Sequence, residues 1–397
     1  RKVMTMAVDK QDKVLNVPNL RFPEFAGEWE KYKLGDIMEF TKERISSSLL
    51  TEDNYVSTEN MLQDFQGVTC AHNVPEDTNV MEYKQGDVLV SNIRPYLKKV
   101  WMADKNGGCS ADVFVMRANG NVCTDDFLHH IVANDRFIGY VMSGAKGVKM
   151  PRGDKEQMKG FRTALPSLKE QQKVAHLLAI IDERISTQIR IFNELQSLIS
   201  GITQRISKHS SIRMTLLSEL LAERNEKNTE LFPVYSVSVS EGVVNQIDYL
   251  GRSFAAADTT HYNVAHRGDI IYTKSPTGEF PFGIIKRNAV ETNVAVSPLY
   301  GVYQPVSDDV AIYLHYYFCS PLNAQNYLHK LIQKGAKNTI NITNQRFLEN
   351  SISLPDKKTL EGFVKLISAV STKLKLEKSL LETLQRQKRY LLTQMFV

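Results

Sequence analysis

The feature that most constrains this chain is a heptad pattern of apolar residues that is present twice. Steps of four and three are sustained for more than four heptads in each copy, a pattern typical of coiled-coil helices. The first series is Val174, Leu178, Ile181, Ile185, Gln188, Phe192, Leu195, Ile199, Ile202 and Ile206. The second is Phe363, Ile367, Val370, Leu374, Glu377, Leu381, Leu384, Lys388, Leu391 and Met395. Each helix is expected to have about 40 residues and a length of about 60 Å.

An isolated helix of this length cannot cover its apolar stripe, so the two copies are natural partners. Similar copies pair most simply about a pseudo-two-fold axis, which makes the helices antiparallel. Gln188 and Glu377 occupy the same position in the two series, near the middle. Antiparallel pairing would bring them together, and a central polar pair fixes the register of a coiled coil. The alternative is that each helix packs on its own globular domain.

Shorter motifs also occur twice and in the same order, which indicates a tandem duplication. They are a Gly-Asp before apolar residues at Gly86 and Gly268, a Gly-Ala-Lys at Gly144 and Gly335, and a Leu-Pro at Leu165 and Leu354. Each Leu-Pro precedes a long helix. Ser167 with Glu170 has the form of a capping box, and Asp356 is a good N-cap.

Between the helices, short β-branched and aromatic runs alternate with short helical patterns. The expected fold is therefore mixed, α/β (α+β), with two tandem α/β domains separated by two long helices that form an antiparallel coiled coil. The expected organisation is an N-terminal arm at 1–27, a first domain at 28–165, a long helix at 166–208, a second domain at 209–354 and a C-terminal long helix at 355–397.

Composition and motifs argue against a self-contained enzyme. The sequence has no GxGxxG, P-loop, HExxH or GxSxG motif and no Pro-Pro of an adenine methyltransferase. A weak nuclease pattern of Glu76, Asp77, Glu82 and Lys84 is more typical of a solvated turn. His129-His130 is more typical of an ordinary helical pair than of a metal site.

The four cysteines and the apolar runs indicate an intracellular, soluble protein. Cys70, Cys109, Cys123 and Cys319 form no CxxC pair, so a zinc ribbon is excluded and four reduced, mostly buried thiols are expected. No apolar run reaches the length of a membrane span, and no signal peptide is recognisable. The net charge of +5 permits an anionic partner without proving one.

Basic clusters are the candidate binding residues, because Arg and Lys suit phosphates and guanine whereas Asn and Gln suit adenine. The candidates are Arg94, Tyr96, Lys98, Lys99, Lys146, Lys149, Arg152, Lys155, Lys274, Lys334, Lys337, Asn338, Asn341, Asn344 and Arg346. A single basic loop is usually a solvated face. Two such loops at equivalent positions of a repeat favour an interface with DNA, although a basic loop can also hold a partner subunit.

Several segments resemble the specificity (S) subunits of type I restriction-modification systems, over nearly the whole chain. They are VPNLRFPEFAGEWEKYKLGDI from Val17, YVSTENM, GDVLVSNIRPYLKKVW, LPSLKEQQKVAHLLAIIDERI from Leu165, FPVYSVSVSEGVV from Phe232, and LETLQRQKRYLLTQMF from Leu381. The second long helix departs from this pattern because it lacks the Glu170-Gln171 pair of the first. The second domain also lacks the Leu34-Gly35-Asp36 seen in the first.

The resemblance implies a cytoplasmic, non-catalytic reader of double-stranded DNA. Each recognition domain would read one half of a split, asymmetric target, and the helices would set the spacer between the halves. The implied partners are two modification subunits, which methylate adenine, and restriction subunits, which translocate DNA. S-adenosylmethionine, ATP and magnesium would bind these partners, and no cofactor or metal is expected on this chain. The alternative is a coiled-coil scaffold that binds only proteins; a nuclease or methyltransferase in its own right is the weakest reading.

Overall fold

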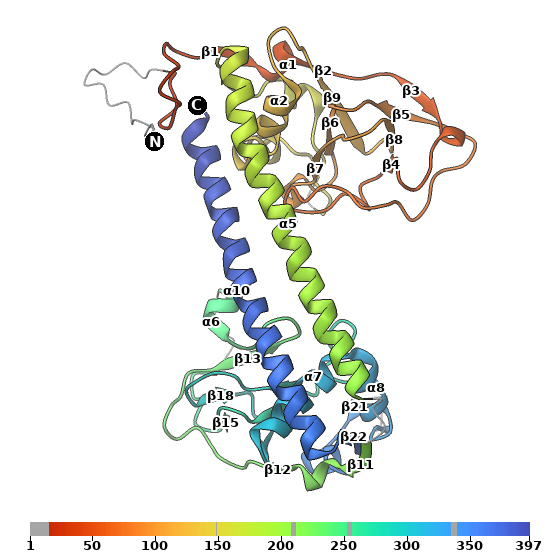
Figure 1. Ribbon diagram of the computed structural model, residues 1–397, viewed down its shortest axis with the longest axis vertical. Helices are drawn as coiled ribbons and strands as arrows, with labels where there is room; N and C mark the ends of the chain where they lie inside the picture. Colours follow the sequence, from red (N-terminus) through yellow and green to blue (C-terminus); the bar gives the residue numbers. More distant parts are fainter. Residues whose placement is uncertain (1–15, 148, 208–211, 252–255, 335–339) are drawn as a thin grey trace. The chain divides into compact units, whose positions relative to one another are not determined.

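A computed structural model describes residues 16–147, 149–207, 212–251, 256–334 and 340–397 of the chain. The chain divides into two compact units. The first comprises Arg1–Arg190 with Ser379–Val397, and the second comprises Ile191–Lys378. Both units contain parts of the two long helices, α5 (Leu168–Ile206) and α10 (Lys357–Met395). Figure 1 shows α5 in yellow-green and α10 in blue, side by side in each unit.

The two long helices are antiparallel within each unit. In the first unit, the start of α5 contributes Val174 and Leu178 to the same core as Met395, at the end of α10. In the second unit, Ile206 at the end of α5 packs against the core that holds Phe363, near the start of α10. All twenty positions of the two predicted apolar series are buried or half-buried. The predicted antiparallel coiled coil is therefore confirmed, and the alternative, in which each helix packs only on its own globular domain, is wrong.

The two polar residues at the equivalent middle position of the apolar series are buried. Gln188 is 5% exposed and Glu377 is 7% exposed. Lys373, one turn before Glu377, forms an ion pair with its carboxylate. Gln188 belongs to the first unit and Glu377 to the second, so their proposed pairing stays a prediction.

The helix starts agree with the sequence in one copy and differ in the other. Asp356 caps α10, because its Oδ1 accepts the backbone N–H of Thr359 at 2.9 Å. At the start of α5, the predicted capping box of Ser167 and Glu170 is wrong, because Glu170 has a different partner. Its carboxylate is buried and instead accepts two hydrogen bonds from Arg21, at 2.7 and 2.8 Å. Because Arg21 lies in the N-terminal segment, this pair ties that segment to the long helix.

The described part of the N-terminal segment, from Asn16, lies against the ends of both long helices. Leu20 donates its backbone N–H to the carbonyl of Gln394 in α10 at 2.9 Å. Phe22 packs on the core of the first unit, beneath the ammonium of Lys173 at 4.6 Å. The segment therefore covers apolar side chains where α5 begins and α10 ends.

A four-stranded antiparallel sheet has the same strand order in both units. In the first unit the order is β2-β9-β6-β7, and in the second it is β12-β19-β16-β17. The first set is β2 (Met38–Phe40), β9 (Val113–Ala118), β6 (Val88–Ser91) and β7 (Val100–Met102). The second set is β12 (Leu221–Glu223), β19 (Gly301–Pro305), β16 (Ile270–Tyr272) and β17 (Ile285–Arg287). The predicted duplication is confirmed by this common topology.

A two-stranded sheet and three short helices complete the part common to both units. The first unit has β1 (Glu30–Lys33) paired with β10 (Arg162–Leu165), and α2 (Asp125–Val132), α3 (Asp135–Ser143) and α4 (Lys155–Lys159). The second has β11 (Ile212–Leu216) paired with β22 (Ser351–Pro355), and α7 (Asp308–Cys319), α8 (Pro321–His329) and α9 (Asn344–Phe347). Each of these six helices begins after an Asn, Asp, Ser or Thr whose side chain accepts a backbone N–H.

The remaining elements differ between the units. The first has α1 (Leu34–Ile37), the 3-10 helices η1 (Ser47–Leu49) and η2 (Pro95–Leu97), and a sheet of β3 (Arg44–Ser46), β5 (Asn79–Tyr83), β8 (Gly107–Cys109) and β4 (Tyr55–Val56). The second has η3 (Leu217–Glu219), α6 (Gln246–Leu250), and the pairs β13 (Tyr235–Ser238) with β14 (Gly242–Asn245), β15 (Asn263–Ala265) with β18 (Val294–Val296), and β20 (Gln333–Lys334) with β21 (Ile340–Asn341). The copies thus share a scaffold and diverge around it.

The repeated Gly-Asp motif forms the same turn in both units. Gly86 and Gly268 have φ of +93° and +94°, a left-handed conformation that favours glycine. The following aspartates, Asp87 and Asp269, are 3% and 2% exposed. Each accepts the backbone N–H of the residue three positions earlier and a two-pronged pair of hydrogen bonds from an arginine. The motif is therefore a structural turn with a buried, compensated charge.

Removal of the arginine from the first of these turns should destabilise the first unit. Arg117→Met leaves the carboxylate of Asp87 buried without its cation, which should lower the free energy of unfolding by about 3 kcal/mol. Urea unfolding can be followed by tryptophan fluorescence, because Trp29 and Trp101, the two tryptophans of the chain, belong to the first unit. The control is Lys105→Met, which removes an exposed ion pair with Asp53 and should cost less than about 1 kcal/mol. Equal losses in both variants would contradict the structural role of the turn.

Among the residues that the structure describes, no helix has both the length and the apolar character needed to cross a membrane.

Candidate nucleic-acid interface

Two basic loops that are far apart in the sequence lie next to each other in the first unit. The loop after β6 carries Arg94, and the loop after α3 carries Lys146 and Arg152. Arg94 donates its backbone N–H to the carbonyl of Pro151 at 2.8 Å, and an isolated β-bridge joins Ile93 to Arg152. The second loop is closed on itself by reciprocal backbone hydrogen bonds between Lys146 and Arg152, at 3.2 and 3.0 Å.

The side chains at this junction of the two loops are exposed and mostly cationic. Arg94, Lys146, Lys149 and Arg152 are all exposed, and Tyr96 is 48% exposed. One carboxylate offsets part of this charge, because Asp112 lies 3.2 Å from the guanidinium of Arg152. We define the basic loop face as the surface formed by these five candidates, namely Arg94, Tyr96, Lys146, Lys149 and Arg152.

The backbone of the first loop is held in an uncommon conformation. Arg94 and Lys98 flank η2 and have φ of +50° and +54°, although neither is glycine. Such residues persist only where their surroundings hold them, and they concentrate at functional sites. The hydrogen bond from Arg94 to Pro151 is one such restraint. The loop therefore presents its side chains from a fixed backbone.

The other three candidates of the first unit are engaged within the protein. The ammonium of Lys98 forms an ion pair with Asp135 of α3 at 2.8 Å. Lys99 donates to the carbonyl of Thr58 at 2.6 Å, and burial lowers its pKa. Lys155 lies over the rings of Phe40 and Phe114 at 5.0 and 4.7 Å, and burial lowers its pKa as well. These contacts position the loops and α4.

In the second unit, the candidates that the structure describes are also partly engaged. Lys274 is half-buried, with φ of +60° and a pKa lowered by burial. Asn344 donates to Glu223 at 2.6 Å, and Arg346 donates to the carbonyl of Leu331 at 3.0 Å. The last two therefore hold α9 against its neighbours.

The remaining four candidates are not placed. Lys337 and Asn338 lie outside the described residues, and so do the side chains of Lys334 and Asn341. The second Gly-Ala-Lys at Gly335 falls in the same gap, so its equivalence to the first loop stays a prediction.

The Glu170-Gln171 pair at the start of α5 has a structural role that was not predicted from the sequence. Gln171 is 1% exposed, donates to the carbonyls of Val122 and Pro166, and accepts the backbone N–H of Thr124 at 3.0 Å. The pair thus fixes both the N-terminal segment and the loop before α2 to the long helix. In the second copy, Leu360 occupies the position that corresponds to Gln171. Leu360 lies in the first turn of α10 and packs in the apolar core of the second unit.

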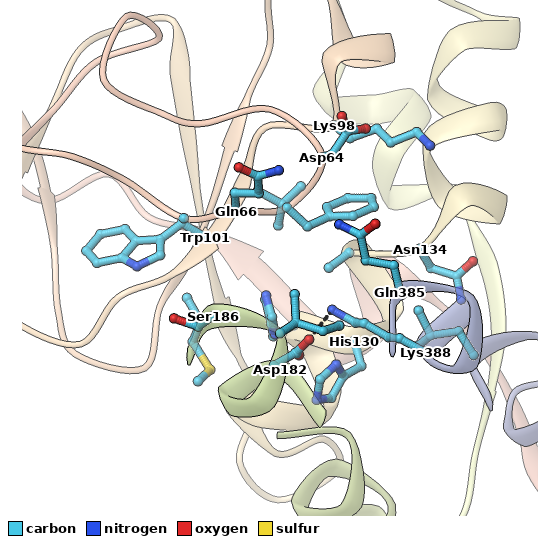
Figure 2. A pocket seen from close by; sticks show the side chains of 18 of the residues that line it. Asp64, Gln66, Lys98, Trp101, His130, Asn134, Asp182, Ser186, Gln385 and Lys388 are labelled. Atoms are coloured by element: carbon cyan, nitrogen blue, oxygen red, sulfur yellow. Dashed lines mark ion pairs between the residues drawn. The ribbon is translucent and has the colours of Figure 1, made fainter. Parts of the chain in front are cut away.

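A pocket of about 740 Å³ lies within the first unit, where the two long helices meet α2 and the loops around Trp101. Figure 2 shows Asp182 and Lys388 next to each other on its wall. Their ion pair joins α5 to α10 at 2.5 Å. Lys388 is the one basic residue of the second apolar series, and a cation at such a position is a sequence signal from which an acidic partner on α5 could have been predicted.

The pocket wall carries both signs of charge and two histidines of α2. His130 is 2% exposed, and burial holds its pKa well below the ordinary value. Burial also lowers the pKa of His129 to about 3. Both imidazoles are therefore neutral at pH 7. Within the described ranges, no group of three or more His, Cys, Asp or Glu side chains is placed to hold a metal ion.

Comparison with known proteins shows which proteins this chain is similar to. The family model "Type I restriction modification DNA specificity domain" matches residues 26–197. The chain is 22% identical over 228 residues to the type I restriction enzyme MjaVIII specificity subunit of Methanocaldococcus jannaschii, covering 55% of this chain and 51% of that protein. It is 24% identical over 150 residues to the type I restriction enzyme EcoDI specificity subunit of Escherichia coli, covering 38% and 32% respectively.

The fold extends further than these sequence matches, which span about half or less of the relatives' length. The crystal structure of the type I restriction-modification system S subunit from M. genitalium superimposes with a TM-score of 0.62 at 15% identity. It covers 96% of this chain and 99% of that chain. The two mixed domains and two long helices are thus the architecture of that subunit.

Proposed function

We propose that this chain, a relative of the specificity subunits of type I restriction-modification systems with the S-subunit fold, is the sequence reader of such a complex. The observation that carries the proposal is the duplicated scaffold. Two domains with one strand order and one set of helices are joined by two antiparallel helices. A DNA-binding protein with two such domains would bind two separated half-sites, as dimeric DNA-binding proteins do.

The two copies share a scaffold but not their loops, which supports an asymmetric target. The basic loop face of the first unit holds Arg94, Lys146 and Arg152 on a fixed backbone. Exposed cations of this kind bind phosphates and, where they reach a groove, guanine. In the second unit, the loop after β16, which corresponds to the loop that carries Arg94, has a different sequence. Each domain would therefore read a different half-site in double-stranded DNA.

The long helices also offer a surface for protein partners. Large apolar side chains on α10 point to solvent, and Leu366, Leu376, Leu380 and Tyr390 are 50%, 64%, 47% and 54% exposed. Leu366 and Leu380 are two heptads apart, and so are Leu376 and Tyr390. Exposed apolar residues that recur on one helix are typical of a docking site. We propose that the modification subunits contact these side chains, with Leu366 and Leu376 in the second unit and Leu380 and Tyr390 in the first.

The chemistry would then belong to the partners. The modification subunits would use S-adenosylmethionine to methylate adenine, and the restriction subunits would use ATP and magnesium in the cytoplasm. This chain would be non-catalytic and would carry no cofactor. Its role would be to place two methyltransferases on one asymmetric site.

The test is to purify the chain with its cognate modification subunit and map the N6-methyladenine that the complex deposits on a DNA library. One motif made of two half-sites with a fixed spacer is expected. Methylation by this chain alone would overturn the non-catalytic assignment. Assembly without any DNA preference would instead favour a protein-binding scaffold.

Charge reversal on the basic loop face should weaken DNA binding. Lys146→Glu adds repulsion at a phosphate-facing position, so the affinity of the complex should fall about tenfold and the slope of log affinity against log salt should become shallower by about one. Fluorescence anisotropy across a salt series measures both quantities. The matched control is Lys105→Glu, a partly exposed lysine that is paired with Asp53 outside this face. Unchanged affinity and slope for Lys146→Glu would show that the face does not contact DNA.

A further inference from the structure

A second cluster of reactive groups lies in the second unit, away from the candidates above. Cys319 is the last residue of α7, and the Nζ atom of Lys286 on β17 lies 3.1 Å from its Sγ. Lys286 is 4% exposed. A buried ammonium requires a compensating group, and the thiol of Cys319 is the one side-chain acceptor that the described structure gives it.

A histidine one turn earlier contributes a second donor to the same sulfur. Nδ1 of His315 accepts the backbone N–H of Arg287 at 3.2 Å, so the ring hydrogen resides on Nε2. Nε2 lies 3.9 Å from Sγ of Cys319. The sulfur thus faces two N–H donors, and a sulfur that accepts from both is best satisfied as a thiolate.

Electrostatics agrees with this geometry. Burial alone would raise the pKa of Cys319, but His315 and Lys286 lower it to about 6. The nearby guanidinium of Arg287 is engaged by Asp308, and the hydroxyl of Tyr316 is bonded to Ser371. By contrast, burial without a cation in contact raises the pKa of Cys109 and Cys123 to about 12.

The cluster is specific to the second unit. The helices α2 and α7 start at equivalent N-caps, Thr124 and Ser307, but α2 has 8 residues and α7 has 12. The additional turn carries Cys319. The strand register places Lys286 opposite Ile271, where the first unit has Trp101 opposite Leu89. The first unit therefore has neither the thiol nor the lysine.

We propose that Cys319 is a thiolate modification site for small peroxides, activated by Lys286 and His315. The sulfur attacks one oxygen of hydrogen peroxide, so that an S–O bond forms as the O–O bond breaks. The departing hydroxide takes a proton from solvent and leaves as water. The sulfur is oxidised by two electrons to the sulfenic acid, and the peroxide is reduced by two. Cys319 is half-buried, so the residue is partly open to solvent.

The first experiment measures the pH dependence of Cys319 alkylation by iodoacetamide in the full-length protein, by peptide mass spectrometry. A midpoint near pH 6 is expected, against about 8.5 for an ordinary thiol. Lys286→Met should raise the midpoint by about one pH unit or more, because it removes the cation nearest to the sulfur. Lys330→Met, at an exposed lysine of the same unit, is the control and should leave the midpoint unchanged.

The second experiment adds hydrogen peroxide with dimedone, which traps sulfenic acid. Cys319 should be trapped at pH 7 in the wild type and at least tenfold more slowly in Lys286→Met. The ultraviolet absorbance of the thiolate, as the difference between wild type and Cys319→Ser, gives the ionisation without any reagent. A midpoint near 8.5 would overturn the thiolate. A thiolate that neither reagent modifies would overturn the modification site.

Discussion

Replacement of residues 28–165 by the equivalent domain of another specificity subunit is expected to change one half of the methylated DNA target. The other half should stay the same, because the second unit keeps its own β12-β19-β16-β17 sheet and its loops. For a half-site of roughly three base pairs at about 1–3 kcal/mol per base pair, the loss of binding to the original site should be at least about a hundredfold. Methylation mapping of cells that carry the chimaera measures the new motif.

The boundaries of the exchange follow from contacts within the first unit. The replaced segment pairs with the long helix through Thr124 and Val122, which bond to Gln171, so the donor domain must keep these backbone contacts. The reciprocal exchange of residues 209–354 is the matched control and should change only the other half-site. A chimaera that alters both half-sites at once would contradict two independent readers.

Lengthening both long helices is expected to lengthen the spacer between the half-sites. Four residues inserted after Arg190 in α5 and four after Lys378 in α10 fall at the boundary between the two units, so each unit keeps its own core. The insertions add about 6 Å and close to one helical turn, which nearly preserves the facing of the apolar series. Since DNA rises about 3.4 Å per base pair, the preferred spacer should grow by one or two base pairs.

A one-residue insertion at the same two points is the control. It rotates each helix by about 100° and misaligns the apolar series, so assembly with the modification subunits should be lost instead. The methylated motif in cells reports the spacer, and co-purification reports assembly. An unchanged spacer in a fully active four-residue variant would show that the helices do not set the distance.

The basic loop face shows how far the sequence alone could go with the candidate site. Composition identified Lys98, Lys155 and Arg346 together with Lys146, because all four are cations in basic segments. In the structure, Lys98 pairs with Asp135, Lys155 covers two aromatic rings, and Arg346 holds a carbonyl. Whether such a cation is exposed or bonded within the protein depends on the direction of its side chain. That direction is set by neighbours that are distant in the sequence.

What the sequence determined by itself was local or periodic. The heptad series identified both long helices, and the repeated Gly-Asp at Gly86 and Gly268 marked equivalent points of the duplication. Asp356 was identified as an N-cap in the same way. These signals are a periodicity, a repeated motif and a local helix start, so they can be recognised without knowledge of the fold.

What only the tertiary structure decided were contacts between distant segments. The arginine that neutralises the buried aspartate comes from β9 in the first unit, as Arg117, and from the residue after β12 in the second, as Arg224. Likewise, Cys319 was indistinguishable from the other thiols until Lys286 was placed beside it. Strand register and the packing of α7 on β17 bring these side chains together. Neither has a local signature in the sequence, because contacts between distant segments become favourable only when the whole domain folds.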